Sequence, residues 1–233
     1  MPVHGLRKMG PGPRTVLVDL THASYEELVD FVFDHPPPAS PWGPEWFHDP
    51  ELEVFYDPRV QAAHLARLFR EPEPIAKRFT CEQLEQGFWL ILGPAGLDSG
   101  FLQGILWDDE LEWELRADLI DAMVDLFADF FAKEPLETTC FLWWDLLAWD
   151  YRPGGRDPER DADDARVQTA MFEALCRILA LDSESCRKAA LHGLGHLCHP
   201  DGPKTIEQWL ISCGNADPEL RDYARECAAG TML

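Results

Sequence analysis

Residues 182–194, DSESCRKAALHGL, and residues 216–228, ADPELRDYARECA, repeat one pattern near the C-terminus. When the two segments are aligned through Arg187 and Arg221, the offset is 34 residues, and an alanine follows each arginine three positions later. Internal similarity at such a period is typical of architectures in which one supersecondary unit is stacked on the next. We therefore expect this part of the chain to contain two copies of a helical unit.

Each copy follows an apolar segment with helical periodicity, VQTAMFEALCRILAL at 167–181 and TIEQWLISCG at 205–214. These features resemble HEAT-like helical repeats, whose second helix often opens with Asp, a short spacer and then R-x-x-A. The resemblance covers about residues 165–233 and rests on two copies. It implies stacked antiparallel helix pairs, an α-solenoid, and most often a surface that binds another protein.

The remainder of the chain divides by composition. From Pro58 onward the helical period dominates, so we expect residues 58–233 to form an all-α domain, a curved α–α superhelix with an exposed loop at about 151–164. Residues 1–57 are rich in proline and tryptophan and predict an irregular arm packed on that helical body. Within the arm, SYEELVDFVFDH predicts a short helix capped by Ser24, and TVLVDL and EVFY are candidate strands.

The charge of the chain restricts its partners. With 42 acidic and 20 basic residues, the net charge is −22 at pH 7, which disfavours nucleic acid and anionic membranes.

The seven cysteines are scattered and odd in number, as expected in a reducing compartment. No secretory signal or apolar span is recognisable. We expect a cytoplasmic protein, and the excess of arginine over lysine fits a bacterial source.

Histidines gather in LHGLGHLCHP, residues 191–200. His192 and His196 lie four positions apart, so both imidazoles share one face of a helix and could chelate zinc. His199, Cys198 or a distant carboxylate would have to complete the set. The sequence thus allows a metal site or a metal-dependent hydrolase at His192, His196 and His199.

A packing role competes with that interpretation. The helical zinc-hydrolase pattern is H-E-x-x-H, and Gly193 stands where its catalytic glutamate would be. Leu191 and Leu194 give the helix an apolar face, and glycine at 193 and 195 favours close helix approach. On this interpretation the histidines pack or cap, and no cofactor is expected.

A second candidate is an acidic stripe, defined as Asp118, Asp121, Asp125 and Asp129, which recur at helical spacing. Like charges one turn apart destabilise a helix, and no basic residue lies among them. Three explanations stay open: a solvated face, a basic partner, or an intramolecular basic strip such as Arg59, Arg67 and Arg70.

A third cluster precedes the stripe. The acidic turn comprises Asp108, Asp109, Glu110, Glu112 and Trp113. Acids at the start of a helix suit its dipole, and acids around a tryptophan also suit recognition of a basic protein.

No nucleotide-binding loop, nucleophile elbow or zinc-ribbon pattern occurs in the chain. The leading hypothesis is therefore a non-enzymatic protein whose acidic turn and acidic stripe bind a basic protein or peptide. An inhibitor or immunity protein against a basic toxin or nuclease belongs to the same class, and the histidine metal site is the competing class. The sequence does not specify an oligomeric state.

Overall fold

The computed structural model describes residues 16–38, 45–49, 51–93, 101–134, 136–213 and 217–231. The described chain is mostly helical, as expected. In the described segments no helix is both long and apolar enough to cross a bilayer. In chain order the helices are α1 (Tyr25–Phe33), α2 (Pro58–Arg70), α3 (Glu73–Arg78), α4 (Cys81–Leu92), α5 (Phe101–Leu106), α6 (Trp113–Leu126), α7 (Glu137–Ala148), α8 (Ala162–Leu179), α9 (Glu184–His196), α10 (Gly202–Ser212) and α11 (Pro218–Ala229).

A small sheet modifies the all-α expectation. The strands β1 (Val16–Asp19) and β2 (Leu52–Phe55) pair in parallel, with Val16 opposite Leu52. Both lie in segments that the sequence marked as candidate strands. Parallel neighbours need a crossover connection, and the connection here contains α1. Ser24 and Glu27 form the capping box that starts this helix, so the N-terminal segment is more regular than an extended arm.

The chain forms two compact units. The first contains residues 1–68 and 73–116, and the second contains residues 69–72 and 117–233. In the first unit, α1 packs against α4. A Cβ on Gly87 would lie 2.2 Å from Cδ1 of Phe33, so only glycine permits this approach.

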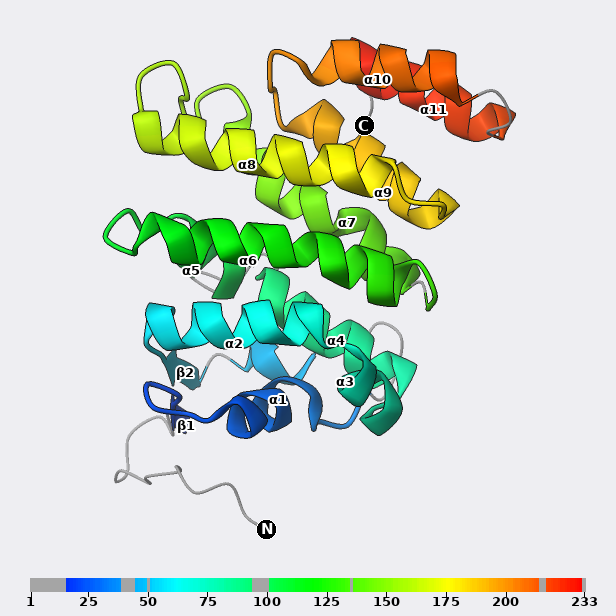
Figure 1. The fold of residues 1–233 in the computed structure, drawn as a ribbon. Helices are drawn as coiled ribbons and strands as arrows, with labels where there is room; N and C mark the ends of the chain where they lie inside the picture. The colour runs from blue at the N-terminus through cyan, green and yellow to red at the C-terminus, as the bar shows by residue number, and fades with distance from the viewer. Residues whose placement is uncertain are drawn as a thin grey trace. The chain divides into compact units, whose positions relative to one another are not determined.

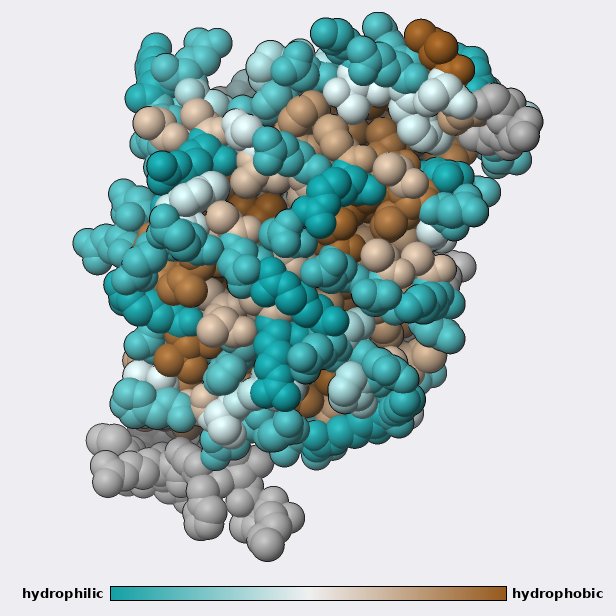
Figure 2. All heavy atoms as spheres, viewed as in Figure 1, coloured by the Kyte–Doolittle hydropathy of each residue, from teal (hydrophilic) through white to brown (hydrophobic). Residues whose placement is uncertain are grey.

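The second unit contains two antiparallel helix pairs. Gln168, near the start of α8, donates a hydrogen bond to the carbonyl of Leu197 just after α9. Likewise Arg221, near the start of α11, donates to the carbonyl of Leu210 near the end of α10. Figure 1 shows α8 beside α9, and α10 beside α11. In Figure 2 the viewed surface of α8 mixes hydrophilic and apolar residues, whereas Val167, Met171 and Leu175 of this helix are buried.

Close packing joins α9 to both α7 and α8. A Cβ on Gly193 would lie 2.5 Å from Cβ of Trp144 and 2.8 Å from Cδ2 of Leu175. These distances are too short for real Cβ contacts, so glycine at 193 allows the three helices to meet. This confirms the close approach expected from Gly193, and it fixes the position of the histidines on α9.

Candidate functional site: an Asp–His–His group

Two histidines of α9 meet a carboxylate of α7. The Nε2 atom of His196 lies 3.3 Å from Oδ1 of Asp145, and the Nε2 atom of His192 lies 3.6 Å from the same oxygen. The three donor atoms all lie within 4.8 Å of one another, and this is the one such potential metal-binding group within the described ranges. We call it the Asp–His–His group.

The group arises from two matched stripes at helical spacing. On the α7 side the stripe continues on either side of Asp145, to Phe141 within the helix and to Trp149 directly after its end. The ring centroid of Phe141 lies 4.5 Å from that of His192, and the ring centroid of Trp149 lies 5.8 Å from that of His196. Because contacts advance in the same direction along both helices, α7 and α9 run parallel at this interface. Their register brings Asp145 between the two imidazoles.

A third helix supplies a partner for His192. The hydroxyl of Tyr223 on α11 makes a short hydrogen bond with Nδ1 of His192, and the two rings are stacked. His192 is only 4% exposed, so this bond satisfies a nitrogen that water cannot readily reach. A hydroxyl both donates and accepts, so Tyr223 can partner either neutral tautomer of the ring. When Nδ1 carries the proton, Nε2 presents its lone pair toward Asp145.

Burial and charge set the protonation states of the group. The contact with His192 holds the pKa of Asp145 below its usual value, so the carboxylate is ionised at neutral pH. Burial lowers the pKa of His196, and the charge of His192 adds to this effect. Burial raises the pKa of the Tyr223 phenol. An ionised carboxylate and a neutral imidazole are the forms that bind metal ions.

The donor spacing is close to that of a metal centre. Zinc binds imidazole nitrogen and carboxylate oxygen at about 2.0–2.1 Å in tetrahedral geometry, which separates neighbouring donors by about 3.3 Å. The distance from Asp145 to His196 equals that separation, and the distance to His192 exceeds it by about 0.3 Å. Small side-chain movements would therefore complete a three-ligand site.

His199 of the predicted set lies apart from this group. Its ring stacks on that of Phe172, with centroids 4.0 Å apart, and its Nδ1 accepts a hydrogen bond from the backbone of Asp201. α9 ends at His196, and Cys198 has a positive φ of 55°, so the chain changes direction before His199. The third donor comes instead from α7, the distant carboxylate that the histidine spacing left open.

The aspartates of the acidic stripe form ion pairs with basic residues of the second unit. Arg70 makes hydrogen bonds to both carboxylate oxygens of Asp118, at 2.9 and 2.7 Å. The same guanidinium lies 3.7 Å from Asp121 and 3.6 Å from Asp125. Arg177 of α8 also pairs with Asp121. Of the explanations for the stripe, the intramolecular one thus has direct contacts in its favour, with Arg70 as its centre.

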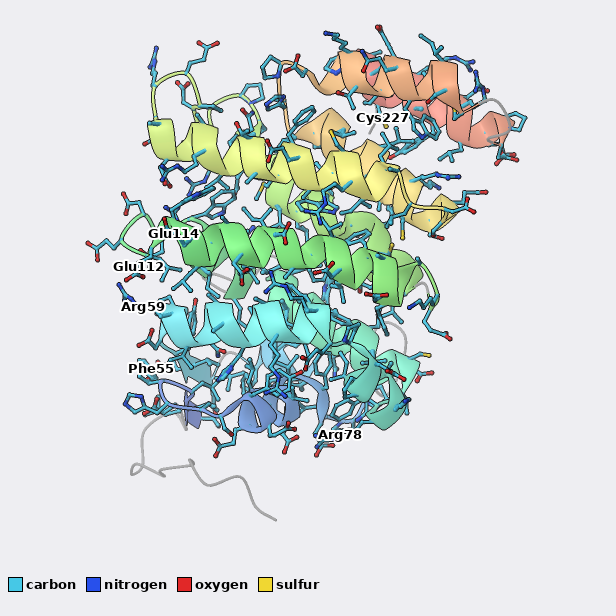
Figure 3. All side chains as sticks on the ribbon, in the orientation of Figure 1. Phe55, Arg59, Arg78, Glu112, Glu114 and Cys227 are labelled. Atoms are coloured by element: carbon cyan, nitrogen blue, oxygen red, sulfur yellow. The ribbon has the colours of Figure 1, made fainter. Side chains whose placement is uncertain are left out.

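Asp129 of the stripe pairs with a lysine, and Arg59 and Arg67 have contacts outside the stripe. Asp129 pairs with Lys133 at 3.1 Å. Arg67 lies over the ring of Tyr25, with its Cζ atom 3.9 Å from the centroid. Arg59 pairs with Glu112 of the acidic turn at 3.0 Å, and Figure 3 shows these two side chains close together.

The acidic turn belongs to the first unit, whereas the acidic stripe belongs to the second. Asp109 and Glu110 are exposed, and Asp108 accepts a hydrogen bond from the backbone of Glu110. Trp113 is half-buried beside the guanidinium of Arg116. The residues predicted to bind a basic partner therefore fall in two different compact units.

No family model matches the chain, and the searches of curated proteins and of solved structures found no match.

Proposed function

We propose that this protein binds one divalent transition-metal ion, with Zn²⁺ as the leading candidate, through Asp145, His192 and His196. The observation that carries the proposal is the convergence of three donor atoms from two helices within 4.8 Å. Two imidazoles and one carboxylate suit zinc and other first-row divalent ions.

The surroundings of the group support the same conclusion. Histidine ligands of metals commonly bond their second ring nitrogen to a fixed partner, which orients the ring. Tyr223 supplies that partner for His192. Three protein ligands also leave a coordination position open, as in catalytic zinc sites rather than in closed structural ones.

Zinc titration of protein that carries no His-tag tests the proposal. Isothermal calorimetry should give one zinc site per chain. Loss of a residue that only hydrogen-bonds to a metal ligand typically weakens metal binding about 10–100-fold. His192→Ala and His196→Ala each remove a ligand itself, so each should weaken zinc binding by more than that. His199→Ala is the matched control, because it removes an imidazole outside the group and should leave the affinity unchanged. Equal loss in all three variants, or no binding by the unmodified chain, would refute the metal site.

The pairing of the C-terminal helices supports a HEAT-like arrangement of residues 165–233. Arg187 and Arg221, which align in the repeat, each tie the second helix of a pair to residues that precede it. Arg187 bonds Asp182 at 3.2 Å, and Arg221 donates to the carbonyls of Leu210 and Cys213 at 3.1 Å. We infer that the two pairs are copies of one unit, and that the metal site lies where this unit meets α7.

A second candidate function is recognition of a basic protein or peptide by the acidic turn. It is favoured by the exposure of Asp109 and Glu110, which have no cationic partner among the residues that the structure describes. If this turn binds such a partner, Asp109→Lys with Glu110→Lys should abolish the interaction, and added salt should weaken it. Proteins that co-purify with the unmodified chain but not with this variant would identify the partner.

A further inference from the structure

We infer that the metal centre at the Asp–His–His group takes an oxyanion, a carboxylate or a phosphate, as its external ligand. This inference rests on the proposed metal site and adds the chemical class of what binds there. It is carried by the cations that flank the two histidines, and by the open position that three protein ligands leave on the metal.

One cation lies a helical turn before His192. The Nζ atom of Lys188 is 5.3 Å from the ring centroid of Phe141 and 5.6 Å from that of Tyr223. Both rings contact His192, so the ammonium lies at the edge of the group. Lys188 is exposed, and no carboxylate of the described chain lies within ion-pair distance of it. In a chain with 42 acidic residues, this lysine keeps its charge free for a ligand.

The opposite side of the group carries a second cation. Trp149 is 50% exposed, and its ring contacts that of His196. The guanidinium carbon of Arg152 lies 5.2 Å from the centroid of this indole. Arg152 also donates a hydrogen bond to the carbonyl of Trp149 at 2.9 Å and lies 3.6 Å from Asp150. An exposed aromatic ring with a cation over it therefore borders the histidine pair at this end as well.

The balance of charge at the site favours an anion. A divalent ion bound by one carboxylate and two neutral imidazoles retains one positive charge. Lys188 adds another nearby, whereas the charge of Arg152 is offset by Asp150. The rest of the chain is strongly acidic, so this face would be locally positive on a negative protein. Oxygen anions bind both metal ions and Lys or Arg donors, and charge-assisted hydrogen bonds to them are short and strong.

Lys188→Ala separates anion binding from metal binding. Loss of a nearby positive charge should leave the affinity for a divalent ion unchanged or slightly higher, because the repulsion between the two cations is removed. The same loss should weaken an anion bound to the metal. A residue that only supported the fold would lower both affinities together. A lower anion affinity without a lower metal affinity is therefore the signature of a ligand contact.

Visible absorption of the Co²⁺-loaded full chain provides the test, with acetate and inorganic phosphate as probes at constant ionic strength. Each anion that binds should shift the Co²⁺ bands saturably. In Lys188→Ala the anion should bind about two- to five-fold more weakly, the loss typical of one exposed ion pair. Lys204→Ala, which removes an exposed lysine of α10, is the matched control and should bind the anion normally.

The outcomes distinguish the inference from the function on which it rests. The inference would be overturned, with the metal site left standing, if neither anion shifted the Co²⁺ absorption bands. It would also be overturned if anion affinity fell equally in the two lysine variants. Failure of Co²⁺ to bind at all would overturn both. Stronger binding of phosphate would place the natural ligand among phosphates, and stronger binding of acetate would place it among carboxylates.

Discussion

The acidic stripe and Asp145, both in the second unit, have partners of different chemistry. Three members of the acidic stripe surround the guanidinium of Arg70, whereas Asp145 faces two imidazoles. An arginine is charged at every working pH and has only donors, so it stays paired with the stripe and offsets one of its negative charges permanently. A neutral imidazole keeps a lone pair, so the Asp–His–His group retains the ability to bind a cation. The set with more carboxylates is therefore the less suited to a ligand.

The Asp–His–His group depends on the close helix packing at Gly193. Gly193→Ala would place a methyl group against Trp144 and Leu175 and force α9 away from its neighbours. Overpacking of this kind typically costs about 1–3 kcal/mol of the free energy of unfolding. Chemical denaturation should show that loss, and zinc titration should show weaker binding. Gly195→Ala on the same helix is the comparison variant. Unchanged stability in Gly193→Ala would show that α7 and α9 are less closely packed than described.

The hydroxyl of Tyr223 should matter to the metal more than to the fold. Tyr223→Phe leaves Nδ1 of His192 without its partner but keeps the ring in place, so zinc affinity should fall about 10–100-fold. Calorimetry measures the change, and circular dichroism checks that the helices persist. If affinity is retained while stability falls, Tyr223 supports packing only.

Removing Arg70 should destabilise the chain modestly, because the ion pairs of the stripe are substantially exposed. Arg70→Met leaves like charges adjacent on α6, and a loss of about 1 kcal/mol or less is expected. Added salt should shrink the difference between the variant and the unmodified chain. Zinc affinity should not change. A large decrease in zinc affinity would show that the stripe and the Asp–His–His group are coupled.

The two sets should also respond to acid in different ranges, and this is the smallest effect expected. The folded pKa of His196 is lowered by burial, so the metal-free chain should lose stability as pH falls below 6.5 toward that lowered value. The pKa of Asp118 is lowered by its bond to Arg70, so its contribution persists until pH falls below 3.8. Denaturation at pH 7, 6 and 5 should show a shallower decline in His196→Gln. An unchanged decline would assign the loss to other groups.

The sequence revealed the parts of the site that lie on one helix. The spacing of His192 and His196 predicted their shared face, and Gly193 predicted close approach. The cap at Ser24 predicted the start of α1, and this is confirmed. Local periodicity is sufficient for these features because each depends on neighbours within one turn.

Contributions from other helices could not be predicted from spacing. Asp145 and Tyr223 reach His192 only through the register of α7 and α11 on α9, which is set by packing of the core. His199 was grouped with the other histidines because it is close in sequence, but the helix ends before it. Likewise, Arg70 lies far from the stripe aspartates in the sequence, so no local pattern could predict its contacts with them.

The zinc content of a variant at Asp145, compared with that of a variant in the acidic stripe, tests the central claim most directly. The unmodified chain, Asp145→Ala and Asp121→Ala should be dialysed against the same zinc concentration without a His-tag and measured by elemental analysis. We predict one zinc per chain in the unmodified protein and in Asp121→Ala, and a loss of most of that zinc in Asp145→Ala. Equal zinc in both variants, or none in the unmodified protein, would contradict the account.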